Sequence, residues 1–216
     1  MTNSPPELIY CDEYLLAFNK PAGLLAVPGR GEDKQDCLSA RVQQHYPDAL
    51  IVHRLDMATS GLIIFARGIA MQRRISEMFR EREVKKIYVA IVSGILEPET
   101  GEVNLPVGAD WPNRPRQKID MEKGKPSITH YRVLSHQACS TRLELEPVTG
   151  RTHQLRVHMS ALGHHILGDT LYGDATNIQA AEQFVSAPRL LLHALSLSLS
   201  HPAAQTPLIL RCEAAF

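Results

Sequence analysis

The sequence predicts an α+β fold in which the β-sheet is mixed but mainly antiparallel. Short strand-like segments follow one another along most of the chain, and only three segments have the spacing of an amphipathic helix. Strands that are grouped, with only occasional helices, argue against repeated βαβ units. A length of 216 residues is enough for one large domain or for two small lobes that share a core.

The predicted strands begin with a hairpin over residues 8–20, with Asp12 and Glu13 near its turn. Residues 61–66 form a short apolar run that is typical of a buried strand, and Gly94 is expected to end the next one, at 86–94. The remaining strands, most of which alternate apolar and polar residues, are expected at 128–135, 140–147, 191–201 and 207–212.

The three predicted helices cover residues 36–46, 70–83 and 152–163. Pro47 stops the first helix, and Gly163 fits a C-terminal cap of the third. The second helix has one apolar stripe, made by Met71, Ile75, Met78 and Phe79. The third is expected to place Leu155, Met159 and Leu162 on one face.

Residues 96–126 are rich in glycine, proline and charge, and are expected to form an extended loop that carries binding residues. The net charge of the chain is zero, but residues 67–132 contain 13 basic and 9 acidic side chains. Two denser basic patches lie at 73–86 and 114–125. Charge patterning alone leaves two interpretations open, a solvated surface or a surface that faces phosphates.

Several classes of protein are disfavoured by what the sequence lacks. No apolar run approaches the roughly 20 residues of a membrane helix, and the N-terminus does not resemble a secretory signal. The four cysteines lie far apart, as expected for reduced thiols in a cytosolic protein. Phosphate-loop and dinucleotide-binding motifs are absent, and His153 and His158 do not have the spacing of a zinc site. We therefore expect neither a cofactor nor a metal.

Three residues are candidates for chemistry, each with a plain alternative. Asp56, in the stretch VHRLDMATSGLIIFA, is either a turn former or a catalytic carboxylate kept ionised by a cationic partner. Arg156 is either a surface residue or a cation that turns inward to a carboxylate. Tyr88 is either a core residue or a flat surface for a nucleobase. Spacing alone favours the plain alternative in each case.

Five segments taken together resemble, in order, the motifs of the RluA family of pseudouridine synthases. The pairing of HRLD with TSG is highly specific, and the resemblance extends over about residues 8 to 214. Residues 110–118 (DWPNRPRQK) resemble the family members that act on both tRNA and 23S rRNA. The five segments are NKPAGLLAVPG, VHRLDMATSGLIIFAR, REREVKKIYVAIVSG, GRTHQLRVHMSALGHHILGDTLYG and RLLLHALSLSLSHP.

The resemblance implies a fold and a set of site residues. The fold has two lobes with flanking helices and a central catalytic cleft, within a single catalytic domain over residues 1–216. Many relatives carry an N-terminal S4 RNA-binding domain, which is not expected here. Asp56 matches the catalytic aspartate, Arg156 the arginine that pairs with it, and Tyr88 the aromatic residue against the target base. Leu190 and Leu192, with the leucine between them, match the apolar wall of the pocket.

The resemblance also implies that the substrate is RNA, either a tRNA anticodon stem-loop or a loop of 23S rRNA, and that the isomerisation needs no cofactor. Arg54, with His53 beside it, is expected to support flipping of the target uridine. The predicted phosphate contacts are Lys85, Lys86, Arg114, Arg116 and Lys118. A cytoplasmic monomer without a protein partner is expected. Two alternatives remain, a catalytically silent RNA-binding protein and a hydrolase that uses Asp56 and histidines.

Overall fold

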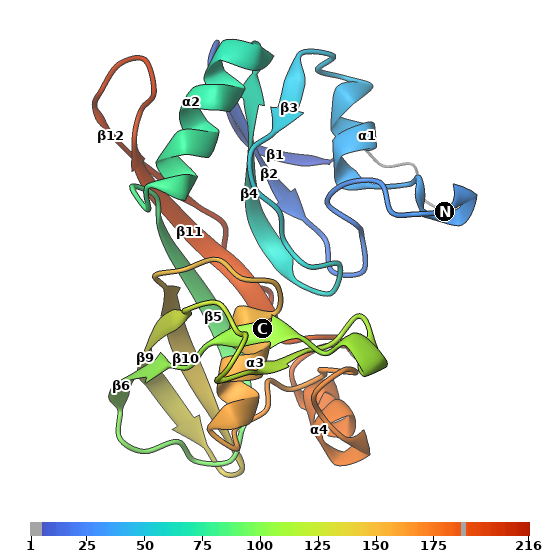
Figure 1. Cartoon of the computed structure of the whole chain (residues 1–216), viewed down its shortest axis with the longest axis vertical. Coiled ribbons are helices and arrows are strands. Elements are labelled where there is room, and N and C mark those ends of the chain that lie inside the picture. Colours follow the sequence, from blue (N-terminus) through green and yellow to red (C-terminus); the bar gives the residue numbers. More distant parts are fainter. Residues whose placement is uncertain (1–5, 187–188) are drawn as a thin grey trace. The chain divides into compact units, whose positions relative to one another are not determined.

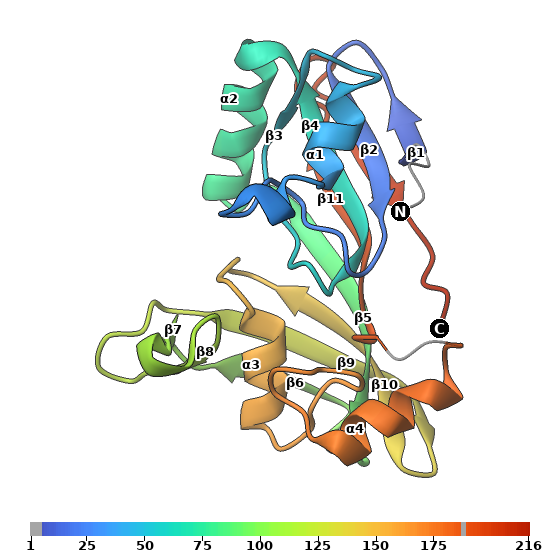
Figure 2. The same ribbon diagram turned by 90° about the vertical axis from the view of Figure 1, so that its right-hand side faces the viewer.

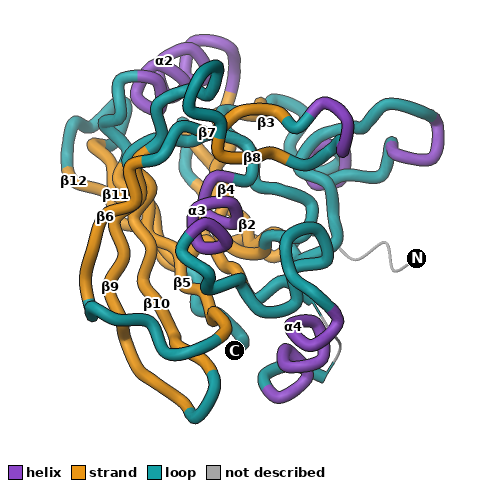
Figure 3. Tube along the Cα trace, turned by 60° about the horizontal axis from the view of Figure 1, so that its bottom comes forward, coloured by secondary structure: helices purple, strands orange, loops and turns teal. Residues whose placement is uncertain are grey.

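A computed structural model describes residues 6–186 and 189–216, and its described residues divide into two compact units. Unit 1 comprises Met1–Lys85 and Ala194–Ala214, and unit 2 comprises Lys86–His193 and Ala215–Phe216. Two of the three boundaries fall within strands, β5 and β11 (Figure 1), and the third lies after β12, between Ala214 and Ala215. Strands make up most of the regular structure in the tube drawing of Figure 3. Within each unit, neighbouring strands pair in the antiparallel direction. This confirms the predicted α+β class.

Unit 1 contains the predicted hairpin and the buried strand that follows it. The strand order is β1-β2-β4-β11, with β12 paired to β11 and β3 paired to β4. β4 is the central strand, and seven of its eight residues are buried. The bounds are β1 Glu7–Cys11, β2 Leu15–Lys20, β3 Ala49–Ile51, β4 Ser60–Arg67, β11 Leu192–Ser200 and β12 Pro207–Arg211.

Two helices belong to unit 1, α1 (Leu38–Gln43) and α2 (Gly68–Arg80). α1 is shorter at both ends than predicted. The predicted stripe of α2 is confirmed, because Ile75 and Met78 are buried in the core, and Met71 and Phe79 pack against the same cluster. That cluster joins α2 to apolar side chains of β2, β4, β11 and β12, so the helix covers the sheet that carries the loop before β4.

Unit 2 contains a second group of antiparallel strands in the order β5-β10-β9-β6, together with a small sheet of β7 and β8. The bounds are β5 Lys85–Ser93, β6 Thr100–Asn104, β7 Val107–Ala109, β8 Gln117–Ile119, β9 Ile128–Gln137 and β10 Ser140–Pro147. The expectation of a loop over 96–126 is therefore partly wrong, because β6, β7 and β8 lie in it. These three strands were not predicted because most of their residues are polar. Of their apolar side chains, those of Val103 and Val107 are buried in the core.

The helices of unit 2 are α3 (Gln154–Ala161) and α4 (Ala175–Ala180), and the second of these was not predicted. Figure 2 shows α3 beside the β7–β8 pair, and α3 contacts β8. The predicted face of α3 is partly wrong, because Leu162 is 38% exposed whereas Arg156 and His158 are buried. Gly163 does cap this helix, with φ +82° and its amide bonded to Ser160 O at 2.9 Å. Within the described residues, no helix has the length and apolarity needed to cross a membrane.

Candidate active site

Asp56 lies in the loop between β3 and β4 of unit 1 and is half-buried. Its carbonyl oxygen accepts a hydrogen bond from the Thr59 amide at 3.1 Å, which closes a turn immediately before β4. Gly61 follows with φ +108°, and a Cβ at this position would lie 2.4 Å from Ala194 O on β11. Only glycine therefore allows β4 to approach β11 this closely, and the TSG sequence fixes where the Asp56 loop leaves the sheet.

A buried lysine that was not predicted from the sequence, Lys20, binds backbone carbonyl groups of this loop and of the segment after β2. Lys20 is fully buried at the end of β2, and its ammonium donates hydrogen bonds to Pro21 O at 2.8 Å, Leu24 O at 2.8 Å and Met57 O at 3.1 Å. Burial lowers the pKa of Lys20 to about 7, and the negative charge of Asp56 opposes that shift. Lys20 thus places a positive charge near Asp56 and fixes the backbone of the residue that follows it.

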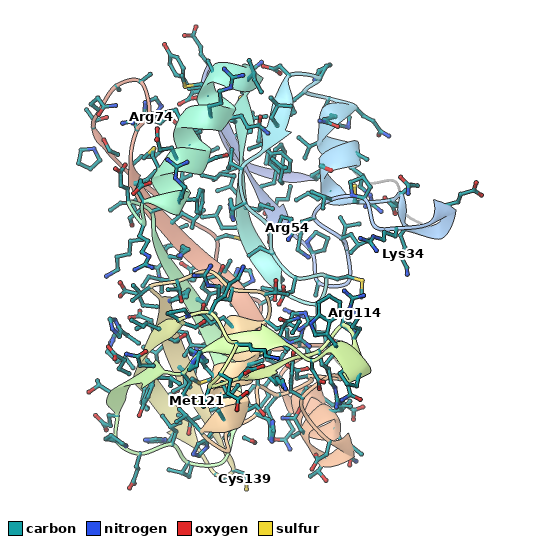
Figure 4. The ribbon with its side chains drawn as sticks, in the orientation of Figure 1. Lys34, Arg54, Arg74, Arg114, Met121 and Cys139 are labelled. Atoms are coloured by element: carbon teal, nitrogen blue, oxygen red, sulfur yellow. The ribbon has the colours of Figure 1, made fainter. Side chains whose placement is uncertain are left out.

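The two residues before this loop have different surroundings. His53 is half-buried, its ring stacks on Phe79 with centroids 4.5 Å apart, and its Nε2 accepts a hydrogen bond from the Ile64 amide at 3.0 Å. Arg54 is exposed and, in the part of the chain that the structure describes, has no ion-pair or hydrogen-bond partner. The scaffold therefore holds His53, whereas the guanidinium of Arg54 is available to a ligand (Figure 4).

In unit 2, Arg156 is held by a carboxylate that the sequence analysis did not identify. Its Nε and one terminal nitrogen donate to the two oxygens of Asp169, both at 2.7 Å, and the side chains are 3% and 1% exposed. Asp169 Oδ1 also accepts the amides of Leu171 and Tyr172. Bidentate geometry and burial make this a strong, charge-assisted pair. The predicted pairing of Arg156 with Asp56 stays a prediction.

Tyr172 connects the Arg156–Asp169 ion pair to His153 at the start of α3 and to β8. The Arg156 guanidinium lies 5.1 Å from the centre of the Tyr172 ring, and the hydroxyl bonds His153 Nδ1 at 2.8 Å. The same hydroxyl accepts the amide of Gln117 on β8, also at 2.8 Å. His153 has φ 53° at the start of α3, a left-handed conformation that is costly for a residue with a side chain. These contacts tie β8, α3 and the segment around Asp169 together.

The other predicted residues of unit 2 lie on β5 and at the start of β11. Tyr88 is half-buried in β5, opposite Leu145 of β10. Leu191 packs with Ile91 and Leu167 in the core, so Leu190 and Leu192, its neighbours in an extended segment, project to the other side. Leu190 and Leu192 are themselves only 2% and 3% exposed, and their place in the wall of a pocket stays a prediction.

The predicted basic contacts are found in two places. Arg114, Arg116 and Lys118 are exposed on the β7–β8 segment, and Lys118 lies 3.7 Å from Asp120. Lys85 is exposed and Lys86 half-buried at the start of β5. Grouped by unit, His53, Arg54, Asp56 and Lys85 belong to unit 1, and the remaining predicted site residues belong to unit 2. Within the described ranges, no group of three or more histidine, cysteine, aspartate and glutamate side chains could hold a metal ion.

Comparison with known proteins identifies the class. The family model described as RNA pseudouridylate synthase matches residues 14–161. The dual-specificity RNA pseudouridine synthase RluA of Escherichia coli K12 is 49% identical over 219 residues, covering 99% of this chain and 97% of the relative. The RluA of Yersinia pestis is 48% identical over 97% of this chain and 99% of its own length. The chain belongs to the RNA pseudouridylate synthase family, whose members are isomerases.

Solved structures agree with this assignment. Human RNA pseudouridylate synthase domain containing 1 matches with a TM-score of 0.81 and 28% identity, covering 100% of this chain and 86% of that one. Human RNA pseudouridylate synthase domain containing 4 matches with a TM-score of 0.75 and 28% identity, covering 96% and 88%. The chain therefore has the fold of these synthases as well as the sequence motifs.

Proposed function

We propose that this chain is a dual-specificity enzyme that isomerises uridine 32 in tRNA anticodon loops and uridine 746 in 23S rRNA. Asp56 is its catalytic carboxylate, and residues 1–216 act as one catalytic domain in a monomer in the cytoplasm. The observation that carries the proposal is the half-buried Asp56, held in an HRLD–TSG loop whose backbone is fixed by the Lys20 ammonium. Near-complete coverage of the dual-specificity relatives supports the choice of substrates.

The reaction needs a nucleophile or base where the sugar joins the base. The N1–C1′ bond of uridine breaks, the uracil turns, and a C5–C1′ bond forms. The hydrogen at C5 leaves as a proton and N1 gains one, so nothing is oxidised and no group is lost. The Asp56 carboxylate attacks C1′ or C6, or assists departure of the base by a glycal route, and carboxylate chemistry at an anomeric carbon is general in glycosidases. Arg156 is the arginine that pairs with this carboxylate and aims it at the substrate.

The target uridine must leave the RNA stack before Asp56 can reach it. Extruding a base costs a few kcal/mol, and a side chain that occupies the vacated position offsets part of this cost. Arg54 is exposed, has a planar cationic head, and lies two residues before Asp56 in the sequence. We assign Arg54 to the vacated position or to the flanking phosphates. His53, which is anchored to the scaffold, fixes the backbone next to Arg54. Tyr88, Leu190 and Leu192 pack against the detached uracil and retain it.

Phosphate recognition falls to the basic side chains outside this loop. Arg114, Arg116 and Lys118 lie on the β7–β8 segment, and Lys85 and Lys86 lie at the start of β5. Each phosphate that such a cation neutralises releases counterions, so the logarithm of the binding constant should fall by about 0.7–0.9 per logarithm of salt. A neutral net charge does not oppose this assignment, because the basic side chains are clustered.

The test is release of tritium from RNA in which the uridines are tritiated at C5. The substrates are a tRNA anticodon stem-loop and a 23S rRNA fragment, each compared with a version in which cytidine replaces the target uridine. Release from both parent RNAs, and from neither cytidine version, supports dual specificity. Binding without release would favour a silent RNA-binding protein. Appearance of free uracil would favour a hydrolase, and insensitivity to a chelator excludes a metal-dependent form of that hydrolase.

A further inference from the structure

We propose that Trp111, with Arg114 stacked on it, forms a platform on which an unpaired nucleobase of the substrate RNA stacks, apart from the uridine that reacts. This inference rests on the proposed function only in that the ligand is RNA. Trp111 begins the short 3-10 helix Trp111–Asn113, which connects β7 to β8 in unit 2. Trp111 is 66% exposed, and the guanidinium carbon of Arg114 lies 3.9 Å from the centre of its ring.

Exposure of this indole is unusual because tryptophan is a large apolar residue whose burial would stabilise the fold. Arg114 covers one face of the ring, which leaves the other face for a ligand. A flat aromatic ring beside a guanidinium is the surface that proteins use to stack unpaired bases, and every base has a suitable face. The pair therefore presents the chemistry of a base-stacking site.

The surroundings of the platform favour a polyanion that carries bases. A surface hollow of about 490 Å³ adjoins Trp111. Its lining includes Lys118 and Lys123, the acidic Asp120 and Glu122, and Met121, which is 74% exposed. Between residues 107 and 125 the chain has five basic and three acidic side chains, although its net charge is zero. Figure 4 labels Arg114 and Met121 on this segment. The exposed indole and methionine side chains suit a base, and the five cations of the segment suit its phosphates.

Two of the three carboxylates in this segment are engaged in local contacts. Asp110 accepts a hydrogen bond from the Asn113 side-chain amide at 2.9 Å. Asp120 accepts the backbone amides of Glu122 and Lys123, and these bonds help to lower the pKa of its carboxyl. Local hydrogen bonds therefore partly compensate the negative charges of Asp110 and Asp120. The side chains of Arg116 and Lys123 remain exposed at the surface of the segment.

The platform is ordered before any ligand arrives. The Asp110 amide bonds Arg116 O at 3.0 Å, the Asn113 amide bonds Asp110 O at 3.1 Å, and the Arg116 amide bonds Asn113 O at 3.0 Å. β8 is in turn anchored to Tyr172 through the amide of Gln117. A connection held in this way loses little conformational entropy on binding, so stacking contributes to affinity with little ordering cost.

The direct test uses the intrinsic fluorescence of the parent protein, because Trp111 is its only tryptophan. Titration with a tRNA anticodon stem-loop should quench the emission in a saturable way, with the same midpoint as binding measured by filter retention. Heparin, a polyanion without bases, should bind at low salt and leave the emission nearly unchanged. Saturable binding of the stem-loop with unchanged emission would overturn the platform, and so would equal quenching by heparin.

Variants give a second readout that does not depend on fluorescence of the parent. Trp111→Leu should weaken stem-loop binding by roughly ten- to a hundred-fold, whereas Trp111→Phe, which retains an aromatic face, should recover most of the affinity. The salt dependence of binding should be the same in both, since neither removes a charge. The matched control is Ile209→Ala, which truncates a side chain that is 71% exposed on β12, and it should bind like the parent. Equal affinity of Trp111→Leu and Trp111→Phe would contradict the platform.

The outcomes separate the platform from the proposed catalytic function. Tritium release by a parent whose emission does not respond to RNA would leave the synthase in place and remove the platform. Quenching by RNA without tritium release from any RNA would support the platform and contradict the proposed substrates. A parent that binds neither stem-loop nor 23S rRNA fragment would contradict both.

Discussion

Arg156 and Asp169 form a bidentate ion pair that is almost completely buried, with both nitrogen–oxygen distances at 2.7 Å. The pair joins α3 to the segment after it, and the Leu171 and Tyr172 amides satisfy the carboxylate further. The direction in which the arginine points is thereby fixed inside unit 2. Asp169 is a positioning residue for an arginine that the proposed mechanism assigns to catalysis.

The first prediction concerns this pair. Asp169→Asn should lower the free energy of unfolding by about 3–5 kcal/mol, because the buried Arg156 charge would lose its bidentate carboxylate. Urea denaturation followed by circular dichroism measures this. The matched control is Asp36→Asn, because Arg41 and Asp36 form a pair with the same two distances of 2.7 Å but with side chains 19% and 48% exposed. That control should lose far less stability, because exposed ion pairs contribute little, and equal losses would contradict the account.

The second prediction concerns the buried Lys20 side chain next to the Asp56 loop, which at pH 9 is a neutral amine because its pKa is about 7. Lys20→Met fills a similar volume but leaves the carbonyl oxygens of Pro21, Leu24 and Met57 without their donor. We expect the free energy of unfolding to fall by about 3 kcal/mol at pH 9, and tritium release to fall as the Asp56 loop loses its anchor. Arg30→Met, which removes an exposed cation from the same unit, should change neither quantity.

The same variant makes a third prediction, about pH. The folded-state pKa of Lys20 is about 7, below its ordinary value of 10.5, so between these values the unfolded chain binds more protons than the folded chain. The stability of the parent relative to Lys20→Met should therefore increase as the pH rises from 7 to about 10. Denaturation of both proteins at several pH values measures it, and a difference that is constant or shrinks over this window would exclude the assigned pKa.

A fourth prediction concerns the buried imidazole of α3. His158 bonds Thr129 Oγ1 and Leu105 O, both at 2.9 Å, and burial lowers the pKa of its ring below the ordinary 6.5. As the pH falls through 6.5 the unfolded chain gains a proton that the folded chain resists, so stability is lost. His158→Gln should be less stable than the parent at pH 7.5 and should lose less on acidification. His45→Gln, at an exposed histidine, should follow the parent throughout.

The fifth prediction separates Arg54 from an ordinary surface arginine. Arg54→Ala should slow tritium release from a stem-loop by at least ten-fold without changing the urea midpoint, because the side chain is exposed and unpaired among the described residues. Its effect should be small on a short single-stranded RNA, in which no stacked partner has to be replaced. Arg74→Ala, at an exposed arginine of α2, is the control and should retain the parent rate on both RNAs (Figure 4).

Periodicity predicted the elements with strong apolar patterns and missed the polar ones. The stripe of α2 and the alternation of β9 and β10 follow from burial of one face, so the sequence records them. β6, β7 and β8 are held mainly by backbone pairing, which leaves little trace in composition. The buried face of α3 was predicted wrongly for another reason. Arg156 and His158 are polar but buried, because they bond Asp169 and Thr129, which lie outside the helix.

The candidate site residues were predicted mainly from motif resemblance, and residue spacing contributed little. Asp56 and Arg156 were identified by resemblance, and spacing alone favoured plain alternatives for both. Lys20 and Asp169, which position them, lie within recognised segments but carry no periodic signal of their own. A lysine that ends an apolar strand was the available clue for Lys20. Asp169 could not be assigned, because its partner is defined only by the fold.

The most direct test of the central claim compares Asp56→Asn with the parent on a tRNA anticodon stem-loop tritiated at C5 of uridine. Asparagine keeps the shape of aspartate and removes its charge, so the variant should bind the RNA and unfold at nearly the urea concentration of the parent. We predict that tritium release falls to background. Release by Asp56→Asn at a rate within ten-fold of the parent would show that this carboxylate is not the catalytic group.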